Sequence, residues 1–390
     1  MTVPLTEGWA SARVPRIALM LAACVPVRPA SAQQPTVEIR STQLLFLAGV
    51  VMSETGTVVV VTVRGAIGDQ RVIASRLSPG SSRVDREIVL QSFHGSLVTP
   101  QVAIARSGNN TFVFAGPDCG EVAPGLKVRR FDFNLVAQGS GQTVTGVSSE
   151  HCWETMLGVA AASDGHIAVA WIMPTDADSG VVYMRRVSRS GAADGEVITA
   201  GAEKAVRYSH PVVALDTAQN VTVAWERTQN DDLRQVLVRR GSRTRAMASS
   251  ARSPAVATLA DGRSVVGWAA GSSEQRAFLQ AFNADGSPAG AAMSGTPASE
   301  RAVDFPAIAM ANDGRYLVAG IEKPGGTSHA VIEAFRFPVQ RMGNLMDRRA
   351  SGVALDPPKL AIGQGGRSWV VAWQELRASG IAIVIVRGKF

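Results

Sequence analysis

The chain has 390 residues, of which 38 are glycine and only 18% are charged, and no long stretch shows a helical pattern of apolar residues. This composition argues against a helical protein and suits one large all-β domain whose cores lie between repeated units. The net charge is +7, but the basic residues are spread along the chain and form no nucleic-acid motif, so we expect no nucleic-acid partner.

Residues 1–32 are predicted to be an export signal. Two arginines precede a short apolar run, and Ala30–Ala32 forms a small-residue cleavage site. The run is too short to span a membrane, and no other segment is long enough. Leu21–Cys24 also matches a lipobox, so two outcomes stay open: soluble export, or a lipid anchor at Cys24 as the only membrane contact. Either way we expect an exported protein (periplasm, outer membrane or medium) with one domain, residues 33–390.

The N-terminal part of this domain contains one isolated alternating run, Thr36–Arg40, before a hairpin pattern that then recurs along the chain. The clearest copy, Ser253–Trp268, has two apolar runs around Asp261-Gly262, where glycine supplies the positive φ of a tight hairpin turn. A proline opens several copies, and we expect it to be the first residue of a strand, where no ladder donor is lost. The other copies are Ala48–Thr62, Pro100–Gly116, Leu157–Trp171, Pro211–Trp225, Pro306–Gly320 and Pro358–Trp373.

The last residues of the seven copies are 43 to 55 residues apart, a period typical of propeller blades. A third and a fourth alternating run follow most hairpins, as at Val181–Arg186 and Glu196–Thr199. The pattern therefore predicts an all-β fold, a seven-bladed β-propeller of four-stranded antiparallel blades. The tryptophans that end four of the hairpins are predicted to be wedges between blades. A stacked β-solenoid is the structural alternative, although its repeats are usually shorter.

The seventh unit has only one more strand, Ile381–Val386, before the chain ends at Phe390. The missing outer strand is predicted to be Thr36–Arg40, because an N-terminal strand that completes the last blade removes two open edges. This closure also explains the short last unit, which a solenoid would not.

Arginine pairs occur in several units, and most of them fall on the predicted third strands. We expect them to lie on a solvated outer face, with a footprint for an acidic polymer as the alternative. The pairs are Arg129-Arg130, Arg185-Arg186, Arg239-Arg240 and Arg348-Arg349.

Two cysteines follow the export signal. Cys119 lies in the connection between the second and third strands of its blade, and Cys152 in the connection into the next blade. In an antiparallel four-stranded blade both connections lie on the same face, so we predict a disulfide, consistent with an oxidising compartment.

Polar residues just ahead of the first strands are the candidate ligand site, because those loops converge on one mouth of the central channel. We expect no metal, since the histidines come from different blades, and no cofactor or catalytic motif is present. The ligand-binding candidates are Glu154, Tyr208, His210, Arg252, Asp304 and Asp356.

The proline-opened hairpin with its Asp-Gly turn and closing tryptophan, best seen in Ser253–Trp268, resembles the divergent repeat propellers of exported bacterial proteins. The resemblance implies the architecture and no ligand. We expect a monomeric, non-enzymatic binding or scaffold module of the cell envelope that recognises a protein or glycan partner through the channel mouth. The alternative is an extracellular glycoside hydrolase or lyase that uses Asp304 and Asp356 as its carboxylates and Arg252 as a charge partner.

Overall fold

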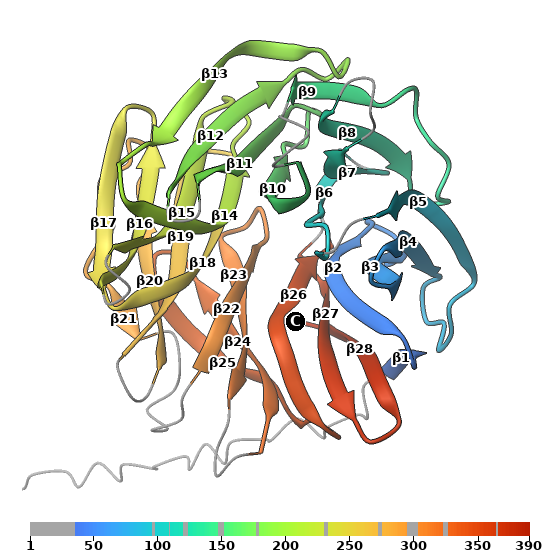
Figure 1. Cartoon of the computed structure of the whole chain (residues 1–390). Helices are drawn as coiled ribbons and strands as arrows, with labels where there is room; N and C mark the ends of the chain where they lie inside the picture. The colour runs from blue at the N-terminus through green and yellow to red at the C-terminus, as the bar shows by residue number, and fades with distance from the viewer. Residues whose placement is uncertain are drawn as a thin grey trace, which may run out of the picture. The chain divides into compact units, whose positions relative to one another are not determined.

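Seven four-stranded antiparallel sheets surround a central axis in the computed structural model (Figure 1). The structure describes residues 36–95, 98–108, 110–119, 124–146, 152–176, 179–229, 233–271, 275–294, 303–322, 327–363 and 366–390. They belong to one compact unit, and the export signal and lipobox predicted within residues 1–32 lie outside the described residues. The predicted seven-bladed propeller is confirmed. In the part of the chain that is described, no helix has the length and apolarity to cross a membrane.

The strands of each blade follow one another outward from the axis, except in the last blade. Blade 1 contains β2 (Leu44–Met52), β3 (Val58–Ala66), β4 (Asp69–Leu77) and β5 (Arg86–His94). Blade 2 contains β6 (Ala103–Ser107), β7 (Thr111–Asp118), β8 (Gly125–Asp132) and β9 (Gln142–Gly146). After the short helix η1 (Cys152–Glu154), blade 3 contains β10 (Met156–Ala161), β11 (Ile167–Asp176), β12 (Ser179–Val187) and β13 (Ala193–Gly201). Blade 4 contains β14 (Val206–Leu215), β15 (Val221–Gln229), β16 (Leu233–Arg240) and β17 (Arg243–Ser249).

Within the described residues, the outer strand of blade 5, β21, contains two residues. Blade 5 contains β18 (Ala251–Thr258), β19 (Ser264–Ala270), β20 (Arg276–Phe282) and β21 (Met293–Ser294). Blade 6 contains β22 (Val303–Met310), β23 (Arg315–Glu322), β24 (His329–Arg336) and β25 (Gln340–Arg349). Blade 7 contains β26 (Val353–Ile362), β27 (Ser368–Arg377), β28 (Gly380–Lys389) and, as its outer strand, β1 (Thr36–Ser41).

The tryptophans that end the hairpins lie between blades, as predicted. Trp171 is 1% exposed and packs in a cluster with Val113 and Val128 of blade 2. Trp225 is fully buried and shares a cluster with Val182 of blade 3. Each wedge therefore joins its own blade to the preceding one, so the apolar cores lie between the blades and leave the axis open.

The prolines do not open the innermost strands, and this expectation was wrong. β14 begins at Val206, and Pro211 lies within a shift of the ladder register between Ser209 and Val212. The same shift encloses the corresponding prolines of β18, β22 and β26. The inner edge of such a strand faces the channel and has no neighbouring strand, so a residue without an N–H is tolerated in a bulge there.

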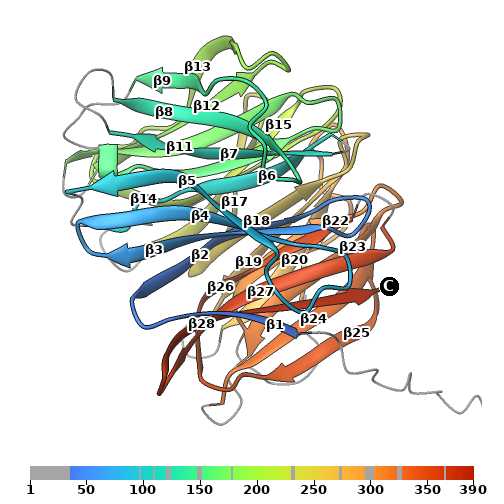
Figure 2. The ribbon, with the colours of Figure 1, turned by 90° about the vertical axis from the view of Figure 1, so that its right-hand side faces the viewer.

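The N-terminal strand closes the ring, as predicted. β1 pairs antiparallel with β28 over its whole length, from Thr36 opposite Val386 to Ser41 opposite Ile381. Figure 2 shows β1 beside β28 at the outer side of the last blade. Val37 and Ile39 are buried in the cluster between blades 7 and 1.

Arg377 on β27 fixes this closing strand electrostatically. Its two Nη atoms donate to the two carboxylate oxygens of Glu38 at 3.0 Å, and its Nε donates to Glu375 at 2.8 Å. The hydrogen bonds from Arg377 are the main cause that lowers the pKa of Glu38 to about 2. The N-terminal and C-terminal parts of the chain are thus joined by backbone pairing, apolar burial and a two-pronged ion pair.

The arginine pairs on the third strands reach across to neighbouring blades and are only partly solvated. In each pair the first arginine donates to a backbone carbonyl on the outer strand of the preceding blade. The three bonds are Arg129 to Leu90 at 3.2 Å, Arg185 to Val144 at 2.6 Å, and Arg239 to Thr199 at 2.8 Å. The expected solvated outer face therefore describes these residues incompletely.

The predicted disulfide is present between Cys119 and Cys152, which are 33 residues apart, with their Cα atoms separated by 5.7 Å. It joins the end of β7 in blade 2 to η1, which leads into blade 3. The bond therefore fastens two consecutive blades on one face of the ring.

Candidate functional site

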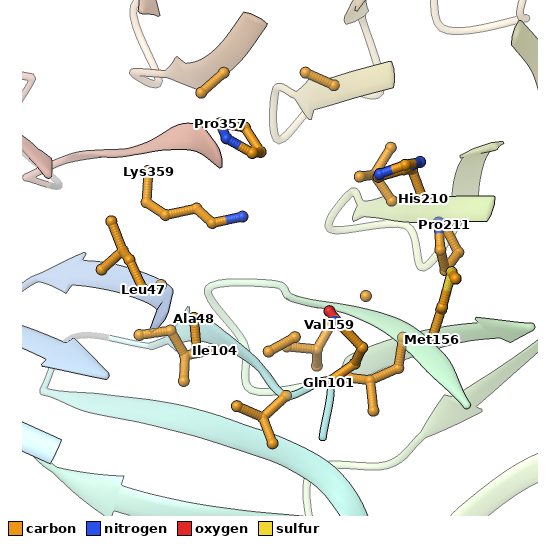
Figure 3. A pocket seen from close by; sticks show the side chains of 18 of the residues that line it. Leu47, Ala48, Gln101, Ile104, Met156, Val159, His210, Pro211, Pro357 and Lys359 are labelled. Atoms are coloured by element: carbon orange, nitrogen blue, oxygen red, sulfur yellow. The ribbon is translucent and has the colours of Figure 1, made fainter. Parts of the chain in front are cut away.

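A cavity of about 550 Å³ occupies the central channel. All seven innermost strands line it, together with the segment 99–102 ahead of β6. Its walls are mostly aliphatic (Figure 3). They include the bulge prolines Pro211, Pro254, Pro306 and Pro358. This volume is in the range of ligand pockets, which are mostly apolar with a few placed polar groups.

Equivalent residues of the seven inner strands form a ring around the cavity, and one of them is charged. The seven inner-strand residues at one ladder position all line the cavity: Gly49, Ala103, Gly158, Val212, Ala255, Ala307 and Lys359. Six are small or apolar, and only Lys359 carries a charge. Figure 3 shows its ammonium group extending into the cavity.

His210 lies on the wall across the cavity from Lys359 (Figure 3). Its backbone has a left-handed φ of 51°, which few non-glycine residues adopt, because it lies in the bulge of β14 just before Pro211. Its Nδ1 is 3.3 Å from the Glu226 carboxylate and 3.0 Å from the Ser209 hydroxyl. These two contacts therefore fix the imidazole at the cavity wall.

Glu226 is a buried carboxylate, 5% exposed, next to the wedge Trp225. Burial raises its pKa, but hydrogen bonds from His210 and the Ser253 N–H bring it below the ordinary value overall. Gln374 in blade 7 makes the equivalent contact, accepting from the N–H of Leu47 at 3.3 Å. These two side chains fix inner-strand bulges of the following blades at the cavity wall.

The six candidate residues occupy different surroundings. His210 lines the cavity, whereas Glu154 is exposed on η1 and Arg252 is half-buried on β18 beside the cavity residue Ser253. Tyr208 is 3% exposed in the core between blades 3 and 4, where its hydroxyl accepts from the N–H of Glu203 at 3.0 Å.

The two carboxylates proposed for catalysis belong to bulged inner strands. Asp304 pairs with Ile321 through its backbone, and Asp356 lies within the register shift of β26. Their side chains lie outside the described residues, so the separation of their carboxyl groups stays open.

Lys359 and Gln101 line the cavity but were not among the predicted site residues. The repeat contained a signal for both, because each follows the proline that opens its hairpin copy. Both residues lie after the proline, whereas the predicted site residues of the proline-opened copies lie ahead of it.

Similarity to known proteins is restricted to structure, since no protein-family model and no curated protein sequence matches the chain. A protein of unknown function from Dyadobacter fermentans superposes with a TM-score of 0.52 at 11% identity, covering 91% of this chain and 98% of that one. The polysaccharide lyase Uly1 gives 0.52 at 8% identity, covering 90% and 98%. A structure from a study of two prolyl endopeptidases gives 0.46 at 11% identity over 86% of this chain, which spans 46% of that one. At these identities the likeness shows the fold alone.

Among the described residues, no group of three potential metal-ligating side chains occurs. Glu333 on β24 of blade 6 is a buried carboxyl with a raised pKa, and it is not part of the cavity lining. Its side chain is 4% exposed, Oε1 accepts from Arg341 at 2.9 Å, and Oε2 is buried without a hydrogen-bond partner. Burial raises the pKa of Glu333 to about 7, helped by the charge of Glu322 and opposed by Arg341.

This buried carboxyl predicts a pH-dependent stability. Because its folded pKa is above the unfolded value, its stabilising effect is complete below about pH 4.5 and is lost as the pH rises through about 7. We expect Glu333→Gln to be more stable than the wild type at pH 8.5 by about 2–3 kcal/mol and to match it more closely at pH 5. Urea unfolding at both pH values measures this, with the exposed Glu196→Gln as control; equal pH dependence in wild type and Glu333→Gln would contradict it.

Proposed function

We propose that the protein is an exported, non-enzymatic binding module whose channel cavity receives a partner protein segment that carries a carboxylate beside apolar side chains. The observation that supports this most directly is the single ammonium group of Lys359 in a ring of otherwise small or apolar residues. An ammonium at an apolar wall attracts a carboxylate more strongly than it would in open water.

The walls favour a peptide over a sugar. A saccharide needs many hydrogen-bonding groups for its hydroxyls, whereas the described lining offers few beyond Thr99, Gln101, His210, Ser253 and Lys359. Its aliphatic and proline surfaces suit apolar side chains. Since peptides end in a carboxylate, a C-terminal segment would meet both requirements.

Export is part of the proposal. The disulfide between Cys119 and Cys152 supports an oxidising compartment, since such bonds are rare in reducing cytosol. The signal segment and the choice between soluble export and an anchor at Cys24 remain predictions, as does the monomeric state.

The alternative, an enzyme that acts on extracellular polysaccharide, requires two carboxyl groups about 5–10 Å apart across the cavity mouth. Asp304 and Asp356 are its candidates. An Asp304→Ala, Asp356→Ala variant that loses hydrolysis or cleavage of an acidic polysaccharide would establish this reading over the binding module.

The binding module is tested with short acetylated peptides that end in leucine, compared as free carboxylate and as amide. We expect calorimetric binding of the carboxylate form, and Lys359→Met to weaken it at least tenfold, which is about 1.4 kcal/mol. Methionine keeps the apolar part of the lysine side chain and removes the charge.

Lys389→Met, which removes an exposed lysine on β28, is the matched control and is expected to bind like the wild type. Equal binding of the amide form, or equal affinity of both lysine variants, would refute a carboxylate site at Lys359. Binding of galacturonic acid oligomers in place of the peptides would favour the glycan reading.

A further inference from the structure

A second polar site lies away from the channel, in a cleft between blades 4 and 5. Its walls include Arg240 at the end of β16, Arg243 and Arg245 on β17, and Ser264 at the start of β19. We call this set the Arg cleft. The enclosed volume is about 20 Å³, which is enough for one oxygen-sized group.

Arg240 is fixed at the inner end of the Arg cleft. It donates to the buried carboxylate of Asp216 at 3.1 Å and to the Thr222 hydroxyl at 3.2 Å. It also packs against two glycine turns of blade 5: a Cβ on Gly262 would lie 2.7 Å from its Nη2, and one on Gly286 would lie 3.3 Å from its Cδ. The guanidinium is therefore held in place before any ligand arrives.

Arg243 and Arg245 form the outer wall. They are two residues apart on one strand, so their side chains leave the same face of β17, and both are exposed. Among the residues that the structure describes, neither has an ion-pair partner within 4 Å. Both guanidinium groups therefore have donors available to an anion.

Ser264 provides an independent sign of a ligand. It is 1% exposed, and its Oγ is buried without a hydrogen-bond partner although it lines the Arg cleft. A buried hydroxyl without a partner costs about 1–3 kcal/mol, and one oxygen of a ligand in the cleft would accept a hydrogen bond from it. The other oxygens would then lie at the mouth, beside Arg243 and Arg245.

The charges around the cleft limit the ligand. Asp216 neutralises Arg240, and the exposed Asp285 in the lining opposes Arg243, so one positive charge remains. We propose that the Arg cleft binds a singly charged terminal sulfate ester, such as one carried by an acidic polymer. A phosphate monoester carries about −1.5 to −2 at pH 7 and fits this charge less well.

The test measures binding of low-mass dextran sulfate to the full chain at fixed salt, because such contacts are screened. We expect Arg243→Gln, Arg245→Gln to weaken binding at least tenfold with an unchanged melting temperature. Arg71→Gln, Arg83→Gln removes the same charge from exposed positions in blade 1 and is expected to change affinity less than twofold. Equal weakening by both double variants would show unspecific attraction and overturn the site.

Competition identifies the chemical source. We expect glucose 6-sulfate to displace dextran sulfate more effectively than glucose 6-phosphate, dimethyl phosphate or inorganic sulfate. Equal or better displacement by any of the last three would overturn the assignment to a sulfate ester. Lys359→Met is expected to leave this binding unchanged, so the result is independent of the proposed channel ligand.

Discussion

Deleting Thr36–Ser41 is expected to lower the melting temperature by more than 10 °C. The deletion removes the buried side chains of Val37 and Ile39, each contributing about 1.5–3 kcal/mol, and opens the edge of β28. Such a loss is a large part of the 5–15 kcal/mol by which domains are usually stable. Circular dichroism during heating measures it, with a chain that begins at residue 34 as control. An unchanged melting temperature would show that β1 is not part of the ring.

A milder variant separates the ion pair from the apolar burial. Since the pKa of Glu38 is lowered to about 2, its stabilising effect is present above about pH 4.5 and is lost as the pH falls through about 2. Because Glu38 is 25% exposed, screening reduces the effect, and we expect Glu38→Gln to lose about 1–2 kcal/mol at pH 7. At pH 2 the difference from wild type is expected to shrink markedly.

Removing the disulfide has the second-largest expected effect. In the chain-entropy model a disulfide loop of this size contributes about 3–4 kcal/mol to stability. We therefore expect Cys119→Ser, Cys152→Ser to lower the free energy of unfolding by about that amount and to unfold at a lower denaturant concentration. Reducing the wild type should give the same curve, while Cys24→Ser should not change it. If reduction left the unfolding midpoint unchanged, the bond would not contribute to stability.

The architecture could be predicted because its signals are local. An Asp-Gly turn between alternating runs specifies a hairpin within about 15 residues of sequence, and the period then counts the blades. Closure by Thr36–Ser41 followed from a simple deficit, since the last unit lacked one strand. The cysteine pairing followed from the face on which two connections of an antiparallel blade lie.

The candidate site was harder to predict because bulges decide where inner-strand side chains point. A register shift between Ser209 and Val212 separates Tyr208, which is buried between blades, from His210, which reaches the cavity. The alternation of a strand cannot be followed through a bulge whose position is unknown. Lys359 was missed for the same reason, as its proline was expected to begin the strand.

The contacts of Arg129, Arg185 and Arg239 have an evolutionary consequence. Each guanidinium donates a hydrogen bond to a main-chain carbonyl of the preceding blade, and every residue type has such an oxygen. A neighbouring blade can therefore change its side chains freely at these points without losing the bond. This form of attachment tolerates sequence drift, and it offers a physical reason why the repeats of one ring can diverge almost beyond recognition while the ring itself persists.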